Sequence, residues 1–239
     1  TCALPISFDP ATKHKTSFVV HSGQFQFKKL TFGLTNAPAI FQMVMSEVLR
    51  GLNWSCAIVY IDDICAFSKD LQEHKLHLQQ IFNRLRKSGL KLKPEKCQFA
   101  VQSVNYLGHV ISKDGISVGL SKTEAVKSFP VPKNVTDVRA FLGLCNYYRK
   151  FVKDFAFIAG PLTTLLKKGV KFKWTDKCQE AFDRLKQALT SPPILVFPDF
   201  NKPFLLYCDA SNISISFILG QYDSIGNEHV IAYGGRSLR

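Results

Sequence analysis

The sequence has no long hydrophobic run: no stretch of about 18 uncharged apolar residues occurs, the length that a membrane-spanning helix needs. No signal peptide and no amphipathic terminal anchor are visible. The seven cysteines form no Cys-x-x-Cys pair and have no zinc-like spacing to histidine. We therefore expect no membrane partner and no zinc site. We also expect free thiols in a reducing, intracellular compartment rather than a secreted protein.

Negative charge is scarce as well. The chain has 31 lysines and arginines but only 18 aspartates and glutamates, which gives a net charge of +13. The excess concentrates in residues 121–174, where eleven basic residues face three acidic ones. This balance favours a polyanionic partner such as nucleic acid, with a merely basic soluble protein as the alternative. With 239 residues, 46% of them apolar, the chain can bury a core in one large domain or two smaller ones.

Two adjacent aspartates, Asp62 and Asp63, interrupt the apolar run from Ala57 to Phe67. Strand-forming residues on both sides predict a hairpin whose turn carries both acids. Carboxylates this close repel each other unless a cation shares the site, and a divalent metal is the common partner in nucleotidyl transfer. The alternative is a solvated Asp-Asp turn, since aspartate favours turns for its own backbone hydrogen bonds.

The Asp pair is one of several ordered motifs along the chain. Asn36 and Pro38 are typical of a helix start, and Gln42 follows them. The set resembles reverse transcriptases, and more narrowly the Pol polyproteins of gypsy-type long-terminal-repeat retrotransposons, over nearly the whole chain. The motifs are Phe32-Gly33-Leu34 with the helix start, Tyr60-Ile61-Asp62-Asp63, Tyr106-Leu107-Gly108-His109, Phe141-Leu142-Gly143 through Arg149, and Asp209-Ala210-Ser211.

This resemblance implies an RNA-directed DNA polymerase with ribonuclease H, acting by two-metal nucleotidyl transfer with Mg²⁺ or Mn²⁺. It implies an RNA or DNA template-primer and deoxynucleoside triphosphates as partners, in a cytoplasmic particle or the nucleus, and it leaves open a homodimer of the parent protein. Implied metal ligands are Asp62 and Asp63 in the polymerase and Asp209 in ribonuclease H. The other implied site residues are Phe32, Gly33, Gln42 and Tyr60 at the nucleotide and template, Tyr106, Leu107, Gly108 and His109 at the primer, and Arg149, Lys150 and Lys153 on the nucleic-acid backbone.

Some acids of the family pattern are missing from this sequence. Reverse transcriptases use a third aspartate on an earlier strand, and Asp9 does not stand in for it. The later ribonuclease H acids are also missing, and Ser214 and Ser216 stand where the family usually has glycines. We therefore expect this chain alone to bind Mg²⁺ weakly and to polymerise poorly or not at all.

Two other function classes stay open. One is a catalytically inactive nucleic-acid-binding remnant or co-opted host protein, and the other is a protein-interaction scaffold. A scaffold differs from both nucleic-acid readings because its partners would be insensitive to salt and its affinity for primer-template would be low.

The expected fold class is α+β, with a reverse transcriptase palm built from an antiparallel sheet and helices. The expected domains are the palm at 1–120, a basic helical thumb with connecting helices at 121–192, and the first strands of a ribonuclease H-like domain at 193–239. One expected helix begins at Asn36, and others cover 71–88, 138–152, 161–168 and 175–190. A further short helix is expected to begin at a capping box formed by Ser121 and Glu124. Expected strands cover 16–20, 24–27, 90–92, 105–111, 204–208, 213–217 and 230–233, besides the Asp hairpin and Ile116 to Val118.

Overall fold

The computed structural model describes residues 6–31 and 33–238, so that Phe32 lies outside the described residues. The chain divides into two compact units, residues 1–101 and 102–239. Each combines helices with short antiparallel sheets, which confirms the expected α+β class.

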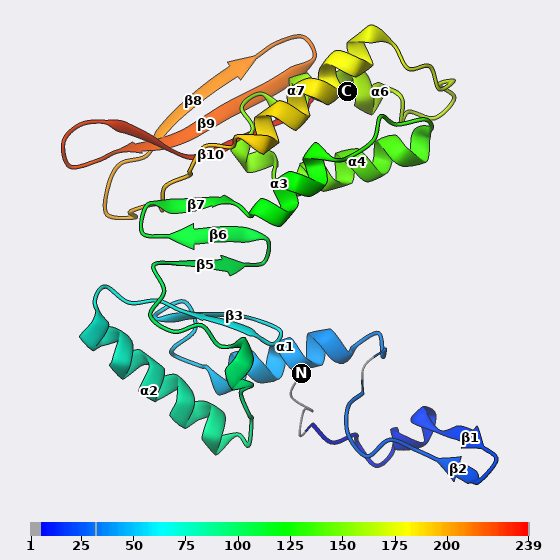
Figure 1. Ribbon diagram of the computed structural model, residues 1–239, viewed down its shortest axis with the longest axis vertical. Helices are drawn as coiled ribbons and strands as arrows, with labels where there is room; N and C mark the ends of the chain where they lie inside the picture. Colours follow the sequence, from blue (N-terminus) through cyan, green and yellow to red (C-terminus); the bar gives the residue numbers. More distant parts are fainter. Residues whose placement is uncertain (1–5, 32, 239) are drawn as a thin grey trace. The chain divides into compact units, whose positions relative to one another are not determined.

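The first unit packs two helices against one hairpin (Figure 1). Its core consists of Met45 from the first helix and Leu49 directly after it, Ala57 and Val59 from the hairpin, and Ile81 and Leu85 from the second helix. A separate hairpin, β1 with β2, exposes all of its residues. The elements are the 3-10 helix Lys13–Thr16, β1 (Phe18–Val20), β2 (Gly23–Phe25), α1 (Ala37–Val48), β3 (Ala57–Tyr60), β4 (Asp63–Ala66), α2 (Leu71–Lys87) and the 3-10 helix Pro94–Lys96.

The helix ends of this unit differ in part from those expected. Asn36 precedes α1, but its side chain makes no capping hydrogen bond. Asp70, which the pattern did not single out, caps α2: its side chain accepts hydrogen bonds from the N–H groups of Gln72 and Glu73. The strand expected at 90–92 is wrong, because the N–H of Leu90 returns to the carbonyl of Leu85 and closes the helix end.

The second unit joins a three-stranded sheet, a cluster of helices and a second three-stranded sheet. Figure 1 shows α3, α4, α6 and α7 gathered together, and their apolar faces form one core around Phe141, Phe151, Phe182 and Leu185. The first sheet is β5 (Ser103–Tyr106), β6 (His109–Ser112) and β7 (Gly115–Val118). The helices are α3 (Leu120–Lys127), α4 (Val135–Tyr147), the 3-10 helix Arg149–Phe151, α5 (Phe155–Ile158), α6 (Gly160–Thr164) and α7 (Asp176–Thr190).

The second sheet has the antiparallel order β10-β9-β8 and packs against α5 and the 3-10 helix Arg149–Phe151. Its strands are β8 (Leu205–Ala210), β9 (Ser214–Tyr222) and β10 (Glu228–Ser237), as the alternating pattern predicted. The segment before it is fixed to the first sheet by a bridge between Ile116 and Leu195. The three antiparallel strands expected after residue 193 are thus confirmed.

Three helix predictions in this unit are wrong in detail. The helix expected over 138–152 ends at Tyr147, and the 3-10 helix Arg149–Phe151 follows it. Ser121 lies inside α3 rather than capping it, because the helix already begins after Gly119, whose N–H donates to the carbonyl of Gly108. The helix expected over 161–168 ends at Thr164. By contrast, α7 has Thr175 as its cap and buries Phe182 and Leu185 as predicted.

The cysteines behave as core residues. The six described ones are free, and Cys56, Cys145 and Cys178 are buried. Burial raises the pKa of the Cys145 thiol to about 12, so this side chain is an unreactive small hydrophobe.

Gly115→Ala should destabilise the chain, because a Cβ would overlap the backbone carbonyl of Leu195 and because the glycine has a φ of +134°. We expect the free energy of unfolding to fall by about 1–3 kcal/mol in urea titrations. Gly143→Ala in α4 is the matched control, with nothing within 4 Å of the new Cβ, and it should stabilise by about 0.5–1 kcal/mol. Equal effects of the two changes would contradict the close approach at Leu195.

Candidate active site

The Asp pair lies at the tip of the β3–β4 hairpin, where Tyr60 pairs with Asp63 and the turn consists of Ile61 and Asp62. The stem is anchored in the core by Ala57 and Val59. At the tip both carboxylates are exposed, and Tyr60 is 52% exposed beside them. The expected hairpin is therefore confirmed, with an apolar stem that holds two acids in solvent.

The turn has an unusual backbone. Ile61 has a φ of 53°, in the left-handed region that β-branched residues avoid. This conformation costs about 1–2 kcal/mol, so surrounding contacts must hold it.

Gln42 of α1 supplies these contacts. Its Oε1 accepts a hydrogen bond of 2.6 Å from the N–H of Ile61, and its Nε2 donates to the carbonyl of Val59 at 3.3 Å. The same nitrogen lies 3.3 Å from the hydroxyl of Ser46, one helical turn further along α1. The amide expected at the nucleotide or template is thus bonded to the hairpin that carries the acids.

The segment before α1 is only partly described. Gly33 has a φ of +90°, and no atom lies within 4 Å of the position that a Cβ would take. A glycine is therefore suited to this place by its backbone conformation and leaves its surface open.

The single strand expected over 105–111 is wrong, because the segment forms two strands, β5 and β6, which make a second tight hairpin at the expected primer element. Its two turn residues, Leu107 and Gly108, have φ values of 51° and 81°, a pattern that suits the twist of the flanking strands. The hydroxyl of Tyr147 donates to the carbonyl of Leu107 at 2.9 Å, and that of Tyr148 to the carbonyl of Gly108 at 3.3 Å. A Cβ at residue 108 would collide with the Tyr148 hydroxyl, so α4 and this turn fit together closely.

His109 lies beneath this turn among aromatic rings. Its ring centre is 5.6 Å from that of Tyr147, 5.5 Å from Tyr148 and 5.7 Å from Phe151. Its Nδ1 lies 3.2 Å from the carbonyl of Leu107, while its buried Nε2 has no hydrogen-bond partner among the described residues. Burial, and then the charge of Lys150, lower the pKa of His109 against the opposing effect of the Leu107 carbonyl.

The three basic residues expected at the nucleic-acid backbone differ in their surroundings. The guanidinium of Arg149 donates to the carbonyl of Gly235 at 2.6 Å and so joins the helical part to β10. Lys150 lies 5.2 Å from the ring centre of Phe151, and burial lowers its pKa. Lys153 is exposed. The contact of Arg149 could not be predicted from the sequence, because its partner Gly235 lies 86 residues away.

Asp209 lies on β8, is exposed, and pairs with Ser216 of β9. The other serine at a usual glycine position, Ser214, is 7% exposed and bonded to the Ser211 hydroxyl. Ser214 is therefore buried, although the alternation of β9 places it on the same face of the sheet as Ser216 and Asp209.

His74 and His77 of α2 both contact the segment that follows β4. The Ser68 hydroxyl lies 3.2 Å from Nδ1 of His74 and 2.8 Å from Nδ1 of His77. Both histidines are half-buried and hold the end of β4 against α2.

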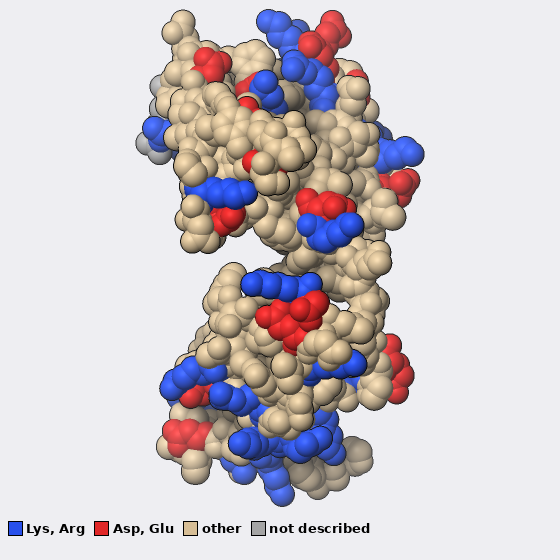
Figure 2. All heavy atoms as spheres, turned by 90° about the vertical axis from the view of Figure 1, so that its left-hand side faces the viewer, with Lys and Arg blue, Asp and Glu red and all other residues tan. Residues whose placement is uncertain are grey.

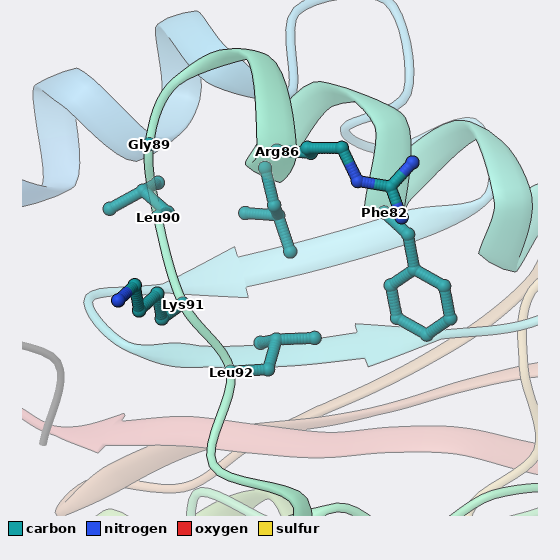
Figure 3. Close-up of a pocket in the computed structure, with 7 residues that line it drawn as sticks. Phe82, Arg86, Gly89, Leu90, Lys91 and Leu92 are labelled. Atoms are coloured by element: carbon teal, nitrogen blue, oxygen red, sulfur yellow. The ribbon is translucent and has the colours of Figure 1, made fainter.

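Charge and surface shape add to this description. In the first unit, Figure 2 shows lysine and arginine side chains gathered toward the lower part of the face in view. A hollow of about 340 Å³ lies at the end of α2, lined by Phe82, Leu85, Arg86 and residues 89–92 (Figure 3). It contains none of the expected site residues.

Within 6–31 and 33–238, no three His, Cys, Asp or Glu side chains come together as a metal site. None of the helices described is both long and apolar enough to cross a membrane.

Comparisons with known proteins match both ends of the chain to family models. Residues 4–111 match the model for reverse transcriptase (RNA-dependent DNA polymerase). Residues 174–239 match the model for the RNase H-like domain found in reverse transcriptase.

Similar curated proteins are transposon polyproteins. The chain is 42% identical over 235 residues to the retrovirus-related Pol polyprotein from transposon 297 of Drosophila melanogaster, covering 98% of this chain and 22% of that protein. It is 38% identical over 221 residues to the Pol polyprotein from transposon gypsy of the same organism, covering 87% and 21%. The chain thus spans about a fifth of the length of the relatives it matches.

A solved structure shows the same fold. The foamy viral protease-reverse transcriptase dRH in complex with double-stranded DNA has a TM-score of 0.85 and 24% identity, covering 98% of this chain and 41% of that one. The related complex with an RNA/DNA hybrid has a TM-score of 0.80.

Stability should fall as the pH drops below about 6.5, the ordinary pKa of histidine, because the folded state lowers the pKa of His109 and the unfolded chain binds this proton more readily. His109→Asn keeps an amide nitrogen near the Leu107 carbonyl but does not titrate. The dependence of Tm on pH between about 5.5 and 7.5 should therefore be shallower in the variant, as thermal unfolding followed by circular dichroism would show. If Tm depends on pH as steeply in His109→Asn as in the wild type, the dependence arises from titratable groups other than His109.

Proposed function

We propose that this chain, which belongs to the Pol polyproteins of gypsy-type long-terminal-repeat retrotransposons, takes part in RNA-directed DNA synthesis and RNA cleavage within a longer parent protein. The observation that carries the proposal is the β3–β4 hairpin, whose buried stem presents Asp62 and Asp63 together at an exposed tip. The match of residues 4–111 to the reverse transcriptase model supports the polymerase assignment.

The donor set at the tip fits a hard divalent cation, since carboxylate oxygens are the ligands that Mg²⁺ and Mn²⁺ prefer. Asp62 and Asp63 would hold the ion, which supplies charge neutralisation at the transferred phosphate and a more nucleophilic 3′ hydroxyl. Tyr60 pairs with Asp63 across the hairpin and is half exposed, so its ring can support the nucleotide or primer end beside the carboxylates. The open surface at Gly33 allows close approach of a base.

The proposed nucleic-acid partner is a template-primer duplex. The solved foamy viral relatives are complexes with double-stranded DNA and with an RNA/DNA hybrid, and they share this fold. The Leu107–Gly108 turn, fixed by Tyr147 and Tyr148, would position the primer. The basic segment 121–174, with exposed Lys153, would contact phosphates.

The last part of the chain would contribute to ribonuclease H. Residues 174–239 match the RNase H-like model, and Asp209 is an exposed carboxylate on the first strand of the β8–β10 sheet. We propose that Asp209 ligates a divalent ion there.

Asp62→Asn and Asp63→Asn should each slow primer extension by the parent polyprotein roughly 100-fold or more, because each removes a charged oxygen ligand. The assay uses an RNA template, a DNA primer and Mg²⁺. Asp114→Asn, an exposed turn aspartate elsewhere, is the control and should extend at the wild-type rate.

Two outcomes would overturn parts of this proposal. Wild-type extension by Asp62→Asn and Asp63→Asn would show that this pair is not the metal site. A wild-type parent that binds primer-template without extending it would identify the protein as an inactive nucleic-acid-binding remnant.

Affinity for an RNA/DNA hybrid should fall steeply with salt. Lys153→Ala should reduce the slope of log K against log salt concentration by about 0.9, the effect of one lost phosphate contact. Lys202→Ala, outside the basic segment, is the control and should leave the slope unchanged. Fluorescence anisotropy at several salt concentrations measures this, and salt-independent binding would favour a protein-interaction scaffold.

A further inference from the structure

We propose that Gln42 is a positioning residue that fixes the conformation of the Ile61–Asp62 turn, rather than a residue that contacts nucleotide or template. This inference deepens the proposed function and rests on it for the role of the Asp pair. The contact itself can be tested without polymerase activity.

Gln42 makes two hydrogen bonds to the backbone of the hairpin. The side-chain amide of glutamine presents a carbonyl and an N–H₂ group, as a peptide unit does. Gln42 uses the carbonyl for the N–H of Ile61 and the N–H₂ for the carbonyl of Val59. These two backbone groups flank Tyr60 in β3, so the amide bonds to the strand as a neighbouring strand would, at the point where the turn begins.

Ile61 has a strained backbone conformation. A β-branched residue with a φ of 53° is held only where other contacts over-determine it. The 2.6 Å bond to Gln42 is the side-chain contact at this N–H, and it acts at the residue immediately before Asp62. Loss of the bond would let Ile61 leave the left-handed region, which would redirect the carboxylate that follows.

The side chain of Gln42 is itself held in place by α1. Ser46 lies four residues further along α1 and contacts the Gln42 nitrogen, while Met45 and Leu49 anchor the helix in the core. A side chain fixed by its own helix in this way can impose its geometry on the turn.

The test compares three variants. Gln42→Met has similar length and makes no hydrogen bond, whereas Gln42→Glu keeps an oxygen acceptor for the N–H of Ile61. Gln80→Met, at an exposed position on α2, is the control.

The first readout is amide hydrogen exchange in the full chain, followed by mass spectrometry. For a peptide covering residues 57–66 we expect exchange about 10-fold faster in Gln42→Met, an intermediate rate in Gln42→Glu and no change in Gln80→Met. Peptides from α2 report global stability and should not change. Unchanged exchange at 57–66 in Gln42→Met would overturn the proposal, whatever the activity.

The second readout is primer extension by the parent polyprotein. We expect kcat to fall about 10- to 100-fold in Gln42→Met, with template-primer affinity changed less than about 2-fold, and a smaller fall in Gln42→Glu. A direct contact with the triphosphate predicts the reverse order, because the glutamate charge would repel the phosphates. If kcat is lower in Gln42→Glu than in Gln42→Met, the proposal is therefore overturned. Absence of extension by the wild type would count against the proposed function alone, since exchange still decides the contact.

Discussion

Two tight turns, at Ile61 and Leu107, each combine a residue in the left-handed region with a hydrogen bond to the side chain of a helix residue. Ile61 and Leu107 have φ values of 53° and 51°, where a Cβ crowds the backbone carbonyl. The Gln42 amide accepts the N–H of Ile61, and the Tyr147 hydroxyl donates to the carbonyl of Leu107. Strands of four residues flank each turn and provide few hydrogen bonds of their own. Both turns that the family resemblance places at the chemistry therefore depend on helices for their shape.

The sequence predicted the elements whose signals are local. In α7 the apolar positions recur at helical spacing, and Phe182 and Leu185 are buried as expected. The Asp hairpin follows from strand-formers on both sides of two acids. The start of α3 could not be predicted in this way: the pattern placed it at Ser121, whereas the helix begins after Gly119, whose N–H donates to the carbonyl of Gly108, eleven residues earlier. Capping patterns identify candidate starts, but a tertiary hydrogen bond selects among them.

The candidate site shows the same division. Its exposed acids could be placed from the sequence, since alternation and turn chemistry are local. The roles of Gln42 and Arg149 could not, because their partners lie 19 and 86 residues away. A basic residue in a basic segment suggests a phosphate ligand, yet the guanidinium of Arg149 bonds to Gly235. It has five N–H donors, so this bond fixes its position and leaves donors for a phosphate.

The β3–β4 hairpin has a buried stem and an exposed tip, so its stability does not depend on the residues that carry the charge. A structural metal site is built by its ion, because the ligands have no reason to meet without it. Here Ala57 and Val59 fix the hairpin in the core, and the two carboxylates stay in solvent where their charge costs little. The packing of the stem therefore does not require a cation at the tip. Burial of the apolar stem stabilises the hairpin, and the acids at the exposed tip contribute little to that packing.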